Sequence, residues 1–89
     1  SPTVNFYTVA RALVAAQAAL DIDRRLALPE KIARDWLLIG DIQRRLGSGP
    51  PSAGNDARVA YSRAREIAEA AGLKEISLIA SQALQAIGM

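Results

Sequence analysis

Two short segments decide how this chain folds: WLLIGDIQ at residues 36–43 and ARVAYSRA at residues 57–64. In both segments, apolar or small residues recur every three or four positions, the spacing that places side chains on one face of a helix. Small side chains at that spacing let one helix approach another closely, and the larger Tyr61 is expected to fill the space between helix pairs. The two segments therefore predict closely packed helices.

The same helical spacing extends over nearly the whole chain, and no segment shows the alternation typical of a β-strand. The 89 residues are 51% hydrophobic but only 4% aromatic, so small side chains supply most of the apolar surface, a composition that favours packed helices. A chain of this length forms at most one domain. We predict a single all-α domain over residues 1–89 with about four helices; its antiparallel helix pairs cover residues 3–47 and 55–87, separated by a loop at 48–54.

Capping residues and helix breakers mark the expected helix ends. Thr3 is a suitable N-cap for the first helix, and Pro29 fits the first position of the second, where a missing N–H costs nothing. Three glycines and two adjacent prolines at residues 47–54 cannot hold a regular helix. Asn55 is the expected N-cap of the third helix, and Gly72 is its expected left-handed stop.

The two halves of the chain resemble each other at an offset of 45 residues. Residues 12–22 read Ala-x3-Ala-x2-Ala followed by Leu-Asp-Ile, and residues 57–67 read Ala-x3-Tyr-x2-Ala followed by Arg-Glu-Ile. Each half is therefore expected to be a helix, a short turn and a second helix.

The pattern Trp-x2-Ile-Gly at residues 36–40, followed after the loop by Ala-x3-Tyr-x2-Ala at residues 57–64, resembles the tetratricopeptide repeat. The pattern of that family is W-x2-L-G-x2-Y and then A-x3-F-x2-A. Gln43 stands where the family has tyrosine, and the loop carries about five extra residues relative to the family pattern. The resemblance implies a fragment of a right-handed superhelix of helix pairs, in which Gly40 permits close approach of the paired helix.

Composition argues against several classes of function. The chain has no His and no Cys, so the commonest general base, thiol nucleophile and metal ligands are missing. We expect no catalytic residues, no cofactor site and no metal site. The formal charge is only +2 and the basic residues alternate with acidic ones, which argues against nucleic acid as a partner. No apolar run is long enough to cross a bilayer, so no membrane association is expected, and the cytoplasm is the default compartment.

A non-catalytic scaffold for protein–protein interaction is the expected function, with a protein or peptide as partner. In the resembled family the first helix of each pair lines a concave groove. That resemblance implies seven groove-facing residues: Arg34, Leu37, Asp41, Arg44, Ser77, Ser81 and Leu84. By contrast, we expect Trp36 and Tyr61 to pack in the core and the Arg24-Arg25 and Arg44-Arg45 pairs to lie on solvated faces.

The alternative is a structural role in self-assembly or within a longer array. The first helix is rich in alanine on more than one side, and terminal repeats normally need a polar outer face. If this helix presents Phe6, Tyr7, Leu13 or Val14 to solvent, a twofold homodimer would cover those side chains. A closed pair is then expected in preference to open stacking.

Overall fold

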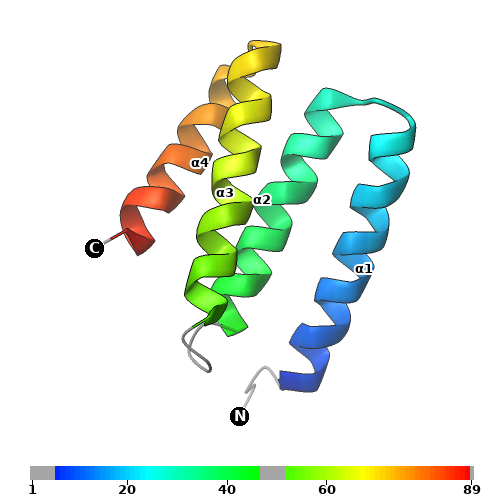
Figure 1. Ribbon diagram of the computed structural model, residues 1–89, viewed down its shortest axis with the longest axis vertical. Helices are drawn as coiled ribbons and strands as arrows, with labels where there is room; N and C mark the ends of the chain where they lie inside the picture. The colour runs from blue at the N-terminus through cyan, green and yellow to red at the C-terminus, as the bar shows by residue number, and fades with distance from the viewer. Residues whose placement is uncertain (1–5, 47–51, 89) are drawn as a thin grey trace.

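The computed structural model describes residues 6–46 and 52–88, and within these ranges it is helical apart from short turns and contains no strand. Its four helices run in antiparallel order, each reversing the direction of the one before (Figure 1). This confirms the prediction of an all-α protein with four helices. The helices are α1 (Phe6–Arg25), α2 (Pro29–Leu46), α3 (Ser52–Ala71) and α4 (Lys74–Ile87).

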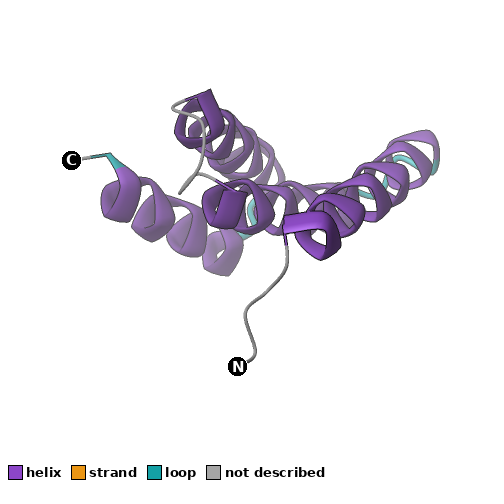
Figure 2. Ribbon diagram, turned by 90° about the horizontal axis from the view of Figure 1, so that it is seen from below, coloured by secondary structure: helices purple, strands orange, loops and turns teal. Residues whose placement is uncertain are grey.

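Helix α2 lies at the centre of an open arrangement. It packs along α1 on one side and along α3 on the other, and it touches α4 over a short stretch, while α4 packs mainly on α3. The view along the helices shows α1 on one flank and α4 on the other, so the four helices form a staggered row that does not close on itself (Figure 2). Both outer helices therefore keep one long side without a helical neighbour in the described structure.

The two helix turns have the same hydrogen-bonded geometry. At the end of α1, Ala27 N–H donates to the Arg24 carbonyl and Leu28 N–H donates to the Asp23 carbonyl, at 3.1 and 3.3 Å. The end of α3 repeats this pair of bonds 45 residues later, from Gly72 to Glu69 and from Leu73 to Ala68. This is the Schellman motif, which requires a left-handed residue after the helix. Ala27 (φ 52°) and Gly72 (φ 73°) supply that residue, and Gly72 is the predicted stop.

A close helix contact joins Gly40 of α2 to Tyr61 of α3. A Cβ atom placed on Gly40 would lie 2.6 Å from Cε1 of the Tyr61 ring, which is fully buried. The Tyr61 hydroxyl donates a hydrogen bond of 2.5 Å to Oδ1 of Asp41 at the protein surface. Burial, and after it the bond to the Asp41 carboxylate, raises the pKa of Tyr61 to about 12, so the phenol stays neutral at physiological pH.

Alanines surround this contact and form the rest of the tightly packed layer. The alanines of α3 that face its neighbours are all buried: Ala57, Ala60, Ala64 and Ala68. Ala60 belongs to an apolar cluster between α1, α2 and α3 around Ile39, and Ala68 belongs to one between α2, α3 and α4 around Ile76. The small side chains let neighbouring helices approach closely, as their spacing predicts.

One predicted helix boundary is wrong. Helix α3 begins at Ser52, so Asn55 lies inside the helix and is not its N-cap, and the expected loop at 48–54 overlaps the first helical turn. Pro29 begins α2 as predicted. Thr3, the expected cap of the first helix, lies outside the described residues.

The left-handed conformation of Ala27 predicts that Ala27→Gly stabilises the protein. An alanine side chain costs about 1–2 kcal/mol in this conformation, and glycine loses about 0.5–1 kcal/mol in backbone entropy on folding. We expect a net gain of about 0.5–1 kcal/mol in the free energy of unfolding, measured by urea denaturation. Ala18→Gly, at an exposed position inside α1, is the matched control and should destabilise the protein by a similar amount. Equal destabilisation by both substitutions would contradict the strained turn.

Candidate protein-binding groove around Trp36

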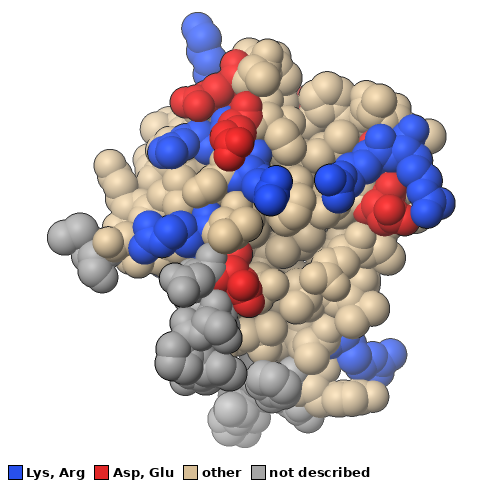
Figure 3. Space-filling view, in the orientation of Figure 1, with Lys and Arg blue, Asp and Glu red and all other residues tan. Residues whose placement is uncertain are grey.

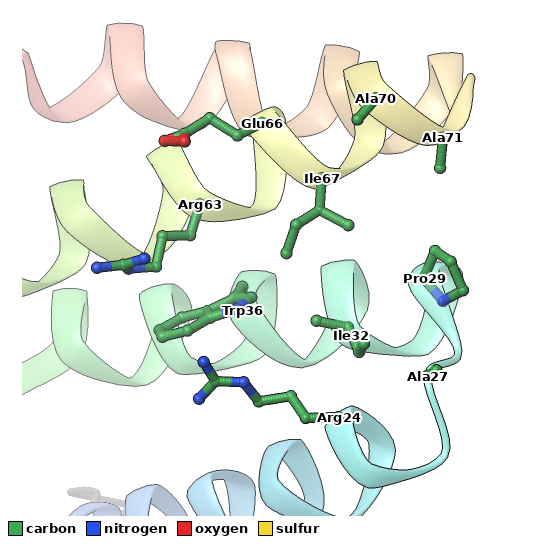
Figure 4. A pocket seen from close by; sticks show the side chains of 10 residues that line it. All are labelled: Arg24, Ala27, Pro29, Ile32, Trp36, Arg63, Glu66, Ile67, Ala70 and Ala71. Carbon is green, nitrogen blue, oxygen red and sulfur yellow. The ribbon is translucent and has the colours of Figure 1, made fainter.

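A cavity of about 720 Å³ opens between α1 and α3, and α2 forms its floor. It continues into a second cavity of about 480 Å³, and Arg24 and Trp36 line both. We call the two together the Trp36 groove. The wider part is shown in Figure 4; it is lined by Arg24, Ala27, Pro29, Ile32, Trp36, Arg63, Glu66, Ile67, Ala70 and Ala71. The narrower part adds Gln17, Leu20, Asp21, Ile39, Gln43, Asp56, Val59 and Ala60.

Trp36 is half buried and stands at the centre of the groove. One side of its indole packs against the apolar cluster between α1, α2 and α3. The guanidinium carbon of Arg63, from α3, lies 5.5 Å from the centroid of the indole ring, a cation–π distance. The Arg24 side chain extends from α1 toward the indole from the opposite side (Figure 4). The tryptophan therefore offers apolar surface between two cationic groups.

The groove is lined by two basic side chains, Arg24 and Arg63, which lie beside the indole, and by three acidic ones, Asp21, Asp56 and Glu66. Arg25 forms an ion pair with Asp21, and Arg34 forms one with Glu30; neither pair includes Arg24 or Arg63. Glu66 is the acidic side chain on the wall of the wider cavity. On the corresponding face of the molecule, basic side chains lie on both sides of the middle of the surface and extend toward one another (Figure 3). An anionic group beside the indole would gain two charge-assisted contacts.

The seven residues implied by the family resemblance do not gather around one cavity. Arg34 is exposed and ion-paired with Glu30, whereas Leu37 is half buried against the cluster around Ile76. Asp41 accepts the Tyr61 hydroxyl. Arg44 is exposed and Leu84 half buried, while Ser77 and Ser81 line a depression between α3 and α4, away from the residues on α2.

The place of two arginines in this groove was not predicted from the sequence. Tyr61 is a core residue as expected, but Trp36 is only half buried and forms part of an open surface. Arg24 was expected on a solvated face, and Arg63 was not considered. These two residues belong to helices on opposite sides of α2, so no spacing along the sequence indicates that they meet at one indole ring.

The described residues contain no group of three or more His, Cys, Asp or Glu side chains arranged to hold a metal ion. One pair of carboxyl groups does meet, Asp23 from α1 and Asp35 from α2. Burial, and after it the hydrogen bond and charge of Asp23, raises the pKa of Asp35 to about 6. One oxygen of Asp35 is buried and has no hydrogen-bond partner among the described residues.

Comparisons with protein-family models, with curated proteins and with solved structures gave no match. In the described parts of the chain, no helix has both the length and the apolarity needed to span a bilayer.

The Asp23–Asp35 pair predicts a pH-dependent stability. The folded protein binds the Asp35 proton more tightly than the unfolded chain, because the folded pKa is raised from 3.8 to about 6. The free energy of unfolding should therefore fall as pH rises through that interval. We expect Asp35→Asn to raise the melting temperature at pH 7.5 and to have a much smaller effect at pH 4. Asp21→Asn, at an exposed site, is the control. An equal effect of Asp35→Asn at both pH values would contradict the raised pKa.

Proposed function

We propose that this protein is a non-catalytic interaction module that binds a partner peptide or helix in the Trp36 groove. The observation that carries the proposal is a half-buried tryptophan, between two arginines outside any ion pair, on the floor of an open apolar groove. Interaction hot spots are enriched in tryptophan and arginine and lie in concave, partly desolvated sites. A solvated surface of scattered charges would not combine these features.

The groove chemistry favours an acidic, amphipathic partner. Ile32, Trp36 and Ile67 provide apolar surface for a leucine or an aromatic anchor. Arg24 and Arg63 stand beside that surface, so a carboxylate next to the anchor in the partner would meet both. The groove runs between α1 and α3, which lie parallel to each other on either side of α2, a shape that accepts an amphipathic helix with anchors one turn apart.

The tetratricopeptide-like architecture is part of this proposal. Two observations support it: the Gly40–Tyr61 contact joins the residues that carry the resemblance, and the two helix turns repeat at an offset of 45 residues. In that family the concave side would bind the partner, through residues such as Leu37 and Arg44. The Trp36 groove instead lies between α1 and α3, and its wider part is the cavity of about 720 Å³.

Trp36 is the only tryptophan of the chain, so its fluorescence reports directly on the groove. Titration with an acidic amphipathic helical peptide containing leucine anchors should shift the emission to shorter wavelength and saturate. The same peptide with each Glu replaced by Lys should bind at least tenfold more weakly, about 1.4 kcal/mol. Binding should weaken with added salt, because the arginine contacts are screened.

The matched variants are Arg24→Gln and Arg25→Gln, at neighbouring positions of α1. Arg24 lines the groove, whereas Arg25 is paired with Asp21 and does not line it. We expect Arg24→Gln and Arg63→Gln each to weaken peptide binding several-fold and Arg25→Gln to leave it nearly unchanged. Equal effects of Arg24→Gln and Arg25→Gln would contradict binding in the groove. Loss of binding in Leu37→Asp and Arg44→Gln alone would instead place the partner on the face that the resemblance implies.

A further inference from the structure

A second concave surface lies on the other side of α1 and has no occupant among the described helices. It is a cavity of about 500 Å³, which we call the alanine depression. Helix α2 contributes its other wall, including Leu38, whose side chain is 49% exposed. The depression is lined by Ala12, Ala15, Ala16 and Ala19 of α1 and by Leu38, Asp41, Ile42 and Arg45 of α2.

The same four positions on α3 are covered by a helix. The counterparts of the α1 alanines, 45 residues later, are Ala57, Ala60, Tyr61 and Ala64, and each of them is at most 1% exposed. Helix α2 packs along α3, places Gly40 against the Tyr61 ring and shares an apolar cluster with Ala60. On α1, Ala12 and Ala15 are exposed and Ala19 is half buried, whereas Ala16 is already buried in the cluster around Ile39. The alanine depression is thus the same helix-docking surface, one repeat earlier, without its helix.

Helix α4 presents the surface that would dock in such a depression. Because the Schellman turns match at an offset of 45 residues, the α2 residues that face α3 have counterparts on α4. Ala33 corresponds to Leu78, which is 59% exposed, and Gly40 corresponds to Gln85, which is also exposed. In both pairs a small side chain faces a larger one. Gly40 faces the large Tyr61, whereas Gln85 would face the small Ala16, the counterpart of Tyr61.

We propose that α4 of one copy of this protein docks in the alanine depression of a second copy, as α2 docks on α3 within the chain. The occupant follows from continuity with the α2–α3 interface, since α4 and α1 carry the two halves of that interface at opposite ends of the row. The contact joins two different surfaces, so it leaves a free depression and a free α4 at the ends of each assembly. Copies therefore add head to tail, with each junction completing a helix pair.

The head-to-tail arrangement and a twofold dimer would use different sides of α1, and the dimer would use its outer side. Tyr7 and Val14 are exposed there, as expected, but Leu13 is half buried against the core, and the side chain of Phe6 lies outside the described residues. With 3.6 residues per turn, Val14 projects from the side of α1 opposite to the alanine depression. A substitution at Val14 therefore separates the two modes of association.

The test uses two variants, each of which blocks one half of the junction. Ala15→Glu places a charge in the alanine depression, and Leu78→Glu places a charge on α4; both positions are exposed, so circular dichroism should remain unchanged. Sedimentation equilibrium of the unmodified chain should give a mass that rises with concentration beyond two copies. Each variant alone should be monomeric. An equimolar mixture should form a heterodimer and nothing larger, because one intact depression and one intact α4 remain.

Val14→Asp is the control and should associate like the unmodified chain. Three results would overturn the proposal: a monomer at every concentration up to millimolar, a mass that stops at two copies and is abolished by Val14→Asp, or a mixture of the two variants that stays monomeric. Peptide binding in the Trp36 groove is read from tryptophan emission and uses neither Ala15 nor Leu78. The two proposals therefore succeed or fail independently.

Discussion

The close approach of α2 and α3 at Gly40 and Tyr61 is the constraint on which the rest of the structure depends. The buried ring lies where a side chain on residue 40 would be, so the two backbones approach more closely than any other residue would allow. The Tyr61 hydroxyl then reaches Asp41 at the surface and satisfies its hydrogen bond. This contact sets the helix separation that the neighbouring alanines require, because alanine packs only where backbones are close.

Both candidate surfaces follow from that separation. Trp36 lies one turn before Gly40 on the same face of α2, but its indole is too large to fit between the closely spaced backbones and lies at the edge of the interface. Helix α1 packs along α2 and leaves an open space beside α3, so one side of the indole stays accessible. The alanine surface that α2 covers on α3 recurs on α1, where the described structure provides no helix to cover it. One packing geometry thus produces an apolar groove and an unoccupied docking surface.

The sequence predicts the helices well because their signals are local. Pro29 and Gly72 mark helix ends through backbone geometry that they adopt in any context. The predicted N-cap at Asn55 is wrong, because a good N-cap residue is also tolerated within a first turn, where backbone amides lack intrahelical partners. The groove was not predictable in the same way. The half-burial of Trp36 depends on the angle between α1 and α3, and the meeting of Arg24 with Arg63 at its ring depends on three helices at once. The Asp23–Asp35 pair likewise joins residues from different helices.

A double-mutant cycle between residues 40 and 61 tests the central claim most directly. Alanine is about 1 kcal/mol better than glycine within a helix, so a loosely packed Gly40 would gain stability on substitution. The account predicts the opposite, that Gly40→Ala lowers the free energy of unfolding by about 1–3 kcal/mol through overpacking against the ring. In a Tyr61→Leu background, which removes the outer ring atoms, the same substitution should be neutral or stabilising. A stabilising Gly40→Ala in the unmodified chain, with no coupling to residue 61, would contradict the account.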